Sequence, residues 1–275
     1  MTENIIDGRA IAQKLFEEIT ERVKSLSFQP LLCDVVVGEA PVSLSYVKIK
    51  GKRARDCGMD FSLVQLPESA TEADVVNAIK SEQQKQNLCG LIVQLPLPAH
   101  LNSKEILQAI NEQVDVDGIN PNISHNLIPP TAGAIMHILD SLEKDFSIDL
   151  KSQKYVVLGN GELVGKPVVQ QLQKRGYDFT FLLSDTENRA EILKSATIII
   201  SGVGKAKILT GVEVNEGVII IDAGTSESGG SIAGDVDFET VSPKAKLITP
   251  SPGGVGPVTV AKLLENVLTV AENKN

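Results

Sequence analysis

Apolar residues along the first 120 positions alternate between helical stripes and short continuous runs. Three runs are mostly apolar and are typical of strands buried on both faces: residues 30–38, 61–66 and 90–95. Asp7 precedes an apolar stripe with four-residue spacing, which predicts a helix that has Asp7 as its N-cap. Further helices are expected from about Ser43 and after Thr71, because Thr71 and Asp74 have the spacing of a capping box. This order of elements predicts a parallel sheet covered by helices.

The second half of the chain repeats the alternation more clearly. Four apolar runs predict strands, with helices between the earlier ones: residues 155–159, 178–183, 197–203 and 217–224. A glycine-rich loop follows the first run, and this order is typical of a doubly wound, nucleotide-binding sheet. A segment rich in Asn and Pro at residues 120–132 predicts the main domain boundary, and the apolar stripe after Pro257 predicts an amphipathic final helix. The predicted fold class is α/β with two domains.

Length and charge narrow the function classes. The 275 residues are 42% hydrophobic, which is enough for one large or two medium cores and excludes a disordered chain. The 26 basic and 35 acidic residues leave a net charge of −9. This charge would repel nucleic-acid phosphates and anionic membranes, so neither is expected as a partner.

Cysteine usage and the amino terminus indicate a cellular compartment. The three cysteines have no C-x-x-C spacing and no nearby histidine pair, so no metal site is predicted and a reducing compartment is favoured. No basic segment precedes an apolar one at the amino terminus, and no run approaches the roughly 20 apolar residues that span a bilayer. We expect a cytoplasmic protein.

The loop after residue 158 is a candidate phosphate-binding site. Its glycines, Gly159, Gly161 and Gly165, have the spacing G-x-G-x-x-x-G between a strand and a helix. Glycines let backbone amides approach a pyrophosphate, and a helix N-terminus favours negative charge. The alternative is a tight turn without a ligand.

The end of the next predicted strand is expected to meet the adenosine ribose. There, Asp185 would repel a 2′-phosphate if it points inward, whereas Ser184 and Thr186 can donate to either form of the cofactor. An exposed Asp185 that caps the following helix is an equally good interpretation.

The second predicted helix carries a candidate acid or base. Ser43, Tyr46 and Lys50 are spaced i, i+3 and i+7, so they project from one face. A lysine beside an aromatic ring and away from water can transfer protons. On the residues alone, a solvated basic face is the favoured interpretation, because other basic residues are close in sequence.

Polar residues also follow two expected strands. Gln94 follows one apolar run, and Asp117 lies in a DVDG segment that is expected to follow another strand. The carboxyl edge of a parallel sheet is where such folds bind ligands, and an amide beside a carboxylate suits a heterocycle. A simple acidic turn is the alternative for DVDG. The rigid loop at residues 249–259 is either a ligand-facing loop or a stiff turn.

Taken together, these segments resemble a known family over nearly the whole chain. Five motifs occur in the order found in the bifunctional methylenetetrahydrofolate dehydrogenase/cyclohydrolase family: Ser43-x-x-Tyr46-Val47-x-x-Lys50, GLIVQLPLP at 90–98, DVDG at 115–118, the glycine loop from Gly159 to Pro167, and PGGVGP at 252–257. The resemblance implies a folate-binding catalytic domain at residues 1–120, with helix 257–275 packed back on it. It also implies a Rossmann-like nicotinamide cofactor domain at residues 121–256, folate in the cleft between the domains, and a homodimer.

The resemblance also implies residue roles. Lys50 is then the key cyclohydrolase residue, Tyr46 stacks on the folate, Gln94 positions Lys50, and Asp117 binds the pterin. The implied substrate contacts are Ser43, Tyr46, Gln94, Leu95, Asp117, Pro252, Gly253 and Gly254. The implied cofactor contacts are Gly159, Asn160, Gly161, Val164, Gly165, Ser184, Gly202 and Thr225.

The cofactor loop departs from the family pattern. Many members have Arg and Ser where Asn160 and Gly161 stand, and a His-Ser pair where Leu183 and Ser184 stand. NADP is the family default, and NAD is possible because Asn160 lacks a positive charge and Asp185 adds a negative one. Two alternatives to a bifunctional enzyme are a cyclohydrolase without useful dinucleotide binding and a non-catalytic folate-binding paralogue.

Overall fold

The computed structural model describes residues 4–120, 127–183, 186–228 and 231–275. Contacts divide the chain into two compact units. The first unit comprises Lys14–Pro130 and Val260–Asn275, and the second comprises Met1–Gln13 and Thr131–Thr259. Each unit contains its own parallel sheet, as the α/β prediction requires.

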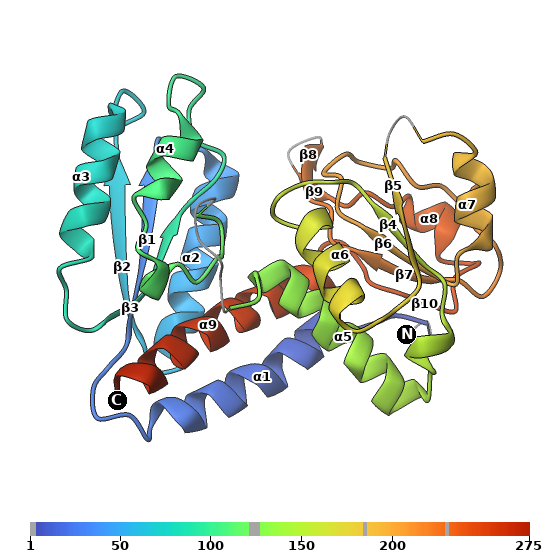
Figure 1. Ribbon diagram of the computed structural model, residues 1–275, viewed down its shortest axis with the longest axis horizontal. Helices are drawn as coiled ribbons and strands as arrows, with labels where there is room; N and C mark the ends of the chain where they lie inside the picture. Colours follow the sequence, from blue (N-terminus) through green and yellow to red (C-terminus); the bar gives the residue numbers. More distant parts are fainter. Residues whose placement is uncertain (1–3, 121–126, 184–185, 229–230) are drawn as a thin grey trace. The chain divides into compact units, whose positions relative to one another are not determined.

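The first unit is built on a three-stranded parallel sheet in the order β2-β1-β3 (Figure 1). The strands are β1 (Leu31–Val37), β2 (Asp60–Leu66) and β3 (Leu88–Val93). These are the three strands predicted from the apolar runs. Strand β1 is central and buried at all seven positions, because β2 and β3 pair with it on either side.

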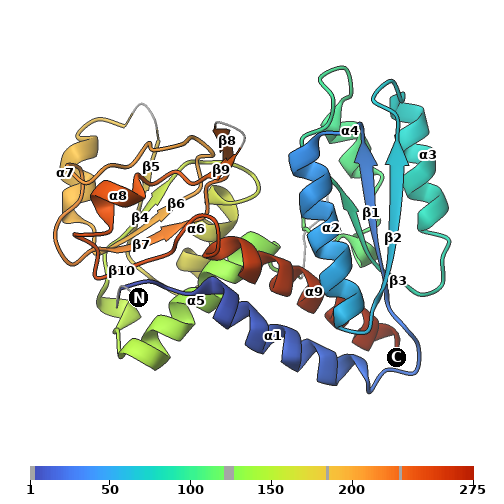
Figure 2. The same cartoon turned by 180° about the vertical axis from the view of Figure 1, so that it is seen from behind.

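Helices cover both faces of this sheet. Helices α3 (Glu72–Glu82) and α4 (Ser103–Gln108) lie on one face and α2 (Pro41–Asp56) on the other (Figures 1 and 2). The predicted capping box at Thr71 is present, since the Asp74 amide donates to Thr71 Oγ1 at 3.2 Å. Helix α2 begins at Pro41, earlier than the predicted Ser43, because proline at the first helical position already has a helical φ.

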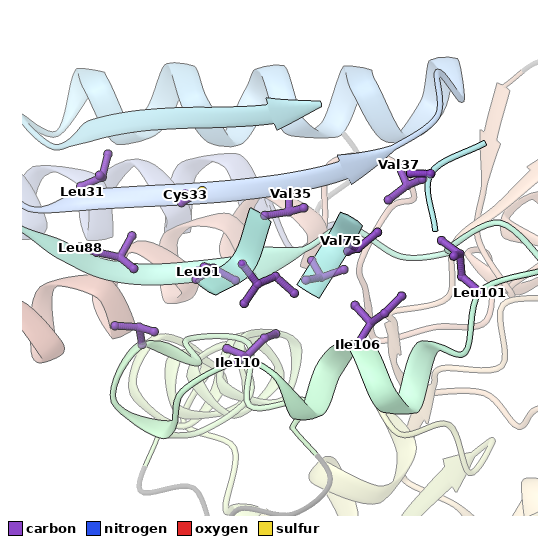
Figure 3. Packing of buried hydrophobic residues seen from close by; sticks show 14 residues of the cluster. Leu31, Cys33, Val35, Val37, Val75, Leu88, Leu91, Leu101, Ile106 and Ile110 are labelled. Atoms are coloured by element: carbon purple, nitrogen blue, oxygen red, sulfur yellow. The ribbon is translucent and has the colours of Figure 1, made fainter. Parts of the chain in front are cut away.

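The alternation of side chains along β1 separates two environments. Leu31, Cys33, Val35 and Val37 belong to an apolar cluster with residues of α3 and α4 (Figure 3). Strand side chains alternate between faces, so Asp34 points to the opposite face, towards α2. A carboxylate is thereby placed inside the core.

Two long helices contribute to both units. Helix α1 (Gly8–Val23) begins as predicted, with the amides of Arg9 and Ala10 donating to the Asp7 carboxylate at 2.9 and 3.1 Å. Helix α9 (Val255–Lys274) packs in the first unit through Asn266, whose amide donates to the Val116 carbonyl at 2.9 Å. Among the described residues, no helix has the length and apolar character needed to cross a membrane.

The second unit contains a five-stranded parallel sheet in the order β10-β7-β6-β4-β5. The strands, in chain order, are β4 (Tyr155–Leu158), β5 (Phe179–Leu182), β6 (Ile198–Ser201), β7 (Ile219–Asp222) and β10 (Leu247–Ile248). Its helices are α5 (Pro130–Phe146), α6 (Gly165–Lys174), α7 (Arg189–Ser195) and α8 (Phe238–Val241). The strand order reverses direction between β4 and β6, as in a doubly wound sheet.

Some details differ from the sequence predictions. The strand expected before the DVDG segment is instead the 3₁₀ turn η1 (Glu112–Val114), followed by a single bridge between Asp115 and Leu91. The Asp115 carboxylate accepts the amide of Gly118, and this local turn competes with strand pairing. The short strands β8 (Ser226–Ser228) and β9 (Ser231–Ala233), the turn η2 (Leu150–Ser152) and β10 were not predicted.

The amino-terminal residues pair with the second sheet. Ile5 bridges Ile248 of β10, and the Ile6 amide donates to the Ile248 carbonyl at 2.9 Å. These contacts explain why Met1–Gln13 group with the second unit.

Candidate active site

Lys50 lies at the centre of a buried polar cluster in the first unit. Its ammonium nitrogen Nζ is 2.5 Å from Asp34 Oδ2 and donates to Gln94 Oε1 at 2.9 Å. The same nitrogen is 5.3 Å from the centre of the Tyr46 ring, one helical turn away. Lys50 is 2% exposed, whereas Lys48 and Lys52 on the same helix are exposed. Lys50 is therefore not part of the solvated basic face.

Gln94 is held so that its amide oxygen meets Lys50. Its backbone amide donates to the Val35 carbonyl at 2.9 Å, which continues the sheet one residue beyond β3. Its side-chain Nε2 donates to the Leu95 carbonyl at 2.7 Å. Since Nε2 is committed to Leu95, Oε1 is left to accept from Lys50. The structure thus brings Tyr46, Lys50, Gln94 and Leu95 together.

Asp34 was missed as a site residue in the sequence analysis. The available signal was a single charged residue in the middle of a strand that is otherwise apolar. Withdrawal from water raises the pKa of the Asp34 carboxyl, and the Lys50 ammonium acts in the opposite direction. Both side chains of the pair are buried, with exposed fractions of 3% for Lys50 and 0% for Asp34.

Removing only one member of this pair is expected to destabilise the fold. We expect Asp34→Val to lower the free energy of unfolding by about 3–5 kcal/mol, because it leaves a buried ammonium without its counter-ion. The double variant Asp34→Val/Lys50→Met is expected to recover most of that loss, since apolar side chains can replace a buried ion pair. Urea unfolding of the wild type, both single variants and the double variant measures this coupling. Simple addition of the two single losses in the double variant would contradict it.

The DVDG segment presents Asp117 beside this cluster. The Asp115 carboxylate accepts the amides of Gly118 at 3.0 Å and Asn120 at 2.8 Å, so Asp115 shapes the loop. Asp117 is half-buried, and withdrawal from water raises its pKa to about 6. The Asp115 and Asp34 carboxylates add to this rise and Lys50 opposes it. The charge of Asp117 therefore changes near pH 6.

The remaining predicted substrate contacts lie in two places. Ser43 is half-buried in the first turn of α2. Pro252, Gly253 and Gly254 form a tight turn in the second unit, where the Gly254 amide donates to the Pro250 carbonyl at 2.8 Å. A Cβ atom added to Gly8 would lie 1.7 Å from the Gly254 carbonyl oxygen, so the start of α1 packs directly on this turn.

The glycine loop of the second unit is a close-packed backbone cradle. Gly159 has φ +91°, and a Cβ atom added to Gly165 would lie 1.9 Å from the Gly159 carbonyl oxygen. The Val164 side chain fills the space next to Gly202, where an added Cβ atom would be 2.3 Å from Val164 Cγ1. Asn160 and Gly161 are exposed in the part of the loop that precedes the start of α6. The loop therefore has the small residues that let a dinucleotide phosphate approach the backbone closely.

A second loop, at residues 202–205, is fixed by a buried aspartate that the sequence analysis did not single out. Asp235 accepts the amides of Val203, Gly204 and Lys205 at 2.7–2.9 Å. It also accepts the Ser201 hydroxyl at 2.7 Å. These donors hold the chain after β6 at the carboxyl edge of the sheet. The exposed Thr225 lies on the neighbouring strand end, with its carbonyl oxygen near Gly204.

Asp222 supports the same arrangement from β7. It accepts the amides of Gly224, Asp235 and Val236 at 3.0–3.1 Å. Burial raises the pKa of Asp222 to about 6, with the Asp235 carboxylate adding to the rise and the backbone donors opposing it.

The residues expected near a ribose are only partly described. Ser184 and Asp185 lie outside the described residues. Two cations that flank this region in the sequence both have carboxylate partners: Lys166 pairs with Glu162, and Arg189 Nε lies 3.2 Å from Glu213. Arg189 also donates to the Ile208 carbonyl at 3.1 Å.

Comparison with known proteins identifies the family. Residues 6–117 match the profile of the tetrahydrofolate dehydrogenase/cyclohydrolase catalytic domain, and residues 129–275 match that of the NAD(P)-binding domain of the same enzymes. The chain belongs to this family. The resemblance inferred from the five motifs, and the two-domain α/β fold that it implied, are therefore confirmed.

Full-length relatives agree with the family assignment. The chain is similar to the bifunctional protein FolD of Bacillus subtilis, with 38% identity over 283 residues and coverage of 99% of both chains. It is similar to the FolD protein of Lactococcus lactis subsp. lactis, with 35% identity and 98% coverage of both chains.

Solved structures of family members have the same fold. The bifunctional FolD enzyme of Campylobacter jejuni has a TM-score of 0.90 and 33% identity, covering 98% of this chain and 99% of that one. The FolD enzyme of Trypanosoma brucei, solved with NADP and an inhibitor, has a TM-score of 0.89 and 30% identity, covering 98% and 97%.

Proposed function

We propose that this chain oxidises 5,10-methylenetetrahydrofolate to 5,10-methenyltetrahydrofolate with NADP and hydrolyses the product to 10-formyltetrahydrofolate. The observation that supports this most strongly is the buried Lys50, whose Nζ is held by Gln94 and Asp34 beside the Tyr46 ring. A module that only binds folate has no need to bury a lysine in this way. The intact cradle around Gly165 supports the dehydrogenase step over a cyclohydrolase alone.

In the hydrolysis, Lys50 is the proposed acid and base. The oxygen of a water molecule bonds to the methenyl carbon, the π electrons of the C=N bond move to nitrogen, and Lys50 as a neutral amine accepts the released proton. The carbon–N5 bond then breaks, N5 keeps the electron pair and receives the proton held by Lys50, and the hydroxyl proton passes to water as the formyl C=O forms. Positioned proton transfer of this kind contributes about 10²- to 10⁴-fold.

The other first-unit residues orient the folate in this proposal. Tyr46 stacks on the substrate, Asp117 receives donors of the pterin, and Ser43 and Leu95 line the same site. Pro252, Gly253 and Gly254 form the remaining proposed substrate contacts. These contacts bring the reacting carbon within reach, which the hydride-transfer step requires above all.

The proposed cofactor contacts are in the second unit. Gly159, Asn160, Gly161, Val164 and Gly165 would receive the pyrophosphate, and Gly202, Thr225 and Ser184 complete the set. A nicotinamide, when bound, supplies the acceptor for the hydride of the folate methylene group. These residues of the chain would hold the cofactor, and we propose NADP as its working form.

The activity test follows both products in one cuvette. The protein is mixed with 5,10-methylenetetrahydrofolate and either NADP or NAD, and the absorbances of reduced nicotinamide and methenyl-folate are recorded together. Production of reduced nicotinamide without lasting accumulation of methenyl-folate supports both activities. Absence of both signals with either cofactor would contradict the proposal.

The charge of Asp117 is expected to control folate affinity. Because its pKa is about 6, the affinity should rise as pH increases through 6 and the carboxyl loses its proton. Asp117→Asn should weaken binding by about 1.5–3 kcal/mol at pH 7.5, the size of a hydrogen bond to a charged group, and should flatten the pH dependence. Isothermal titration with tetrahydrofolate from pH 5 to 8 measures this, with the exposed Glu112→Gln as control. Unchanged affinity in Asp117→Asn would place Asp117 outside the site.

A weak preference for NADP over NAD is expected. Asn160 offers no positive charge, Arg189 is engaged by Glu213, and Asp185 adds a negative charge by sequence. We expect less than about tenfold discrimination, or about 1.4 kcal/mol. Asp185→Arg should strengthen the preference by lowering the NADP KM, because arginine makes directional contacts with phosphate. Strong discrimination in the wild type, together with no effect of Asp185→Arg, would contradict this; Glu187→Arg is the control.

The proposed assembly is a homodimer, as the family resemblance implies, and the cytoplasmic location is proposed from the cysteine usage and the amino-terminal sequence. Light scattering during size-exclusion chromatography gives the mass directly, and a mass near 29.4 kDa would indicate a monomer instead.

A further inference from the structure

Asp34 occupies a position where a carboxylate has few ways to be stabilised. It is 0% exposed and lies in the central strand of its sheet. Strands β2 and β3 pair with β1 along both of its edges, so their ladders use the backbone groups nearby. Neither oxygen of its side chain has a conventional hydrogen-bond partner among the described residues. The close ion contact with Lys50 is what remains, at 2.5 Å.

Lys50 depends on Asp34 in turn. An ammonium group has three N–H donors. Gln94 accepts one of them, and the Asp34 carboxylate supplies the opposite charge. Tyr46 contributes a ring face at 5.3 Å and no charge. The other acidic group that acts on this cluster is Asp117, from the loop after η1, whose interaction with Lys50 is through space.

We propose that Asp34 is a positioning residue that acts through Lys50: it fixes the ammonium nitrogen and stabilises the positive charge that Lys50 gains when it accepts a proton. The inference rests on the proposed cyclohydrolase reaction. When Lys50 accepts a proton from the attacking water, its new positive charge forms 2.5 Å from a carboxylate that burial has deprived of other partners. A charge in a water-poor site is stabilised far more by such a neighbour than it would be in water.

This arrangement has a cost as well as a benefit. The carboxylate favours the charged form of Lys50, so fewer molecules carry the neutral amine at low pH. Asp34 therefore lowers the activity on the acid side of the pH profile, but it holds the acid–base group firmly in place. Asp117 also carries a negative charge above pH 6. It therefore limits the effect on Lys50 of removing the Asp34 charge.

Two uncharged replacements test the inference. Asp34→Asn keeps the shape, and Asp34→Thr suits a strand, so one serves if the other does not fold. Asp60→Asn is the matched control, because Asp60 is an exposed carboxylate at the start of the neighbouring strand β2. Hydrolysis of 5,10-methenyltetrahydrofolate is measured from pH 5.5 to 9. We expect the plateau kcat to fall about tenfold, the KM to stay within about twofold, and the midpoint of the acid limb to move down by about one pH unit.

A second measurement separates this inference from the proposed function. The NMR signal of Lys50 Cε in protein labelled with ¹³C-lysine, assigned by its loss in Lys50→Met, reports the charge of Lys50 without any turnover. Its titration midpoint should fall by about one pH unit in either uncharged variant and stay unchanged in Asp60→Asn. An unmoved midpoint would overturn the role of Asp34, whether or not the protein hydrolyses folate. If the midpoint moves in the Asp34 variants but the wild type shows no hydrolysis, the proposed function is overturned instead.

Discussion

Lys50→Met is expected to reduce hydrolysis of 5,10-methenyltetrahydrofolate by about 10²- to 10⁴-fold, because it removes the group that we propose accepts the proton of water. Methionine keeps the length and apolar stem of lysine, so folate binding should remain measurable. The loss appears in the rate at which methenyl-folate absorbance decays, with correction for the reaction without enzyme.

The matched control for this variant is Lys48→Met. Lys48 lies two residues away on the same helix but is exposed. It should leave hydrolysis unchanged, whereas full hydrolase activity in a correctly folded Lys50→Met protein would remove Lys50 from the mechanism. Circular dichroism and the unfolding midpoint establish that both variants fold.

Gly165→Ala is expected to abolish most of the dehydrogenase activity while sparing the hydrolase. A Cβ atom at this position would lie 1.9 Å from the Gly159 carbonyl oxygen, closer than any real contact, so the loop must move. If the loop binds the pyrophosphate as proposed, its displacement removes backbone donors from that group, and each 1.4 kcal/mol lost weakens cofactor binding tenfold. We expect a loss of about 100-fold in kcat/KM for NADP.

The control for Gly165→Ala is Gln170→Ala, at an exposed position of the same helix. Methenyl-folate hydrolysis by Gly165→Ala should stay within about twofold of the wild type. Equal losses of both activities would indicate that the substitution unfolds the whole protein and does not act on the loop alone. Unaffected dehydrogenase activity would contradict the assignment of this loop to the cofactor.

Strong periodic patterns in the sequence predicted most of the fold. The buried strands β1, β3 and β4 each appear as an apolar run, and the caps of α1 and α3 follow from Asp7 and Thr71. Strand β10 has only two residues, which is too short to carry a period. The sequence pattern predicts a strand before the DVDG segment, but the hydrogen bonds of the Asp115 side chain decide the local structure there.

The candidate site could be predicted only in part. The spacing of Tyr46 and Lys50 placed them on one helical face, and the resemblance linked them to Gln94 and Asp117. Neither pattern nor resemblance revealed that Asp34 meets Lys50, because that contact joins a strand and a helix through tertiary packing. Asp235 is a similar case, since its role depends on amides more than 30 residues away.

One chain is expected to carry out both steps on the same folate. The most direct measurement incubates the wild type with 5,10-methylenetetrahydrofolate and NADP, then quantifies NADPH and 10-formyltetrahydrofolate in the same samples by chromatography. The two products are expected to form in equal amounts, with the formyl product appearing well above the level without enzyme. NADPH formed with methenyl-folate left to hydrolyse at the uncatalysed rate, or no NADPH at all, would contradict it.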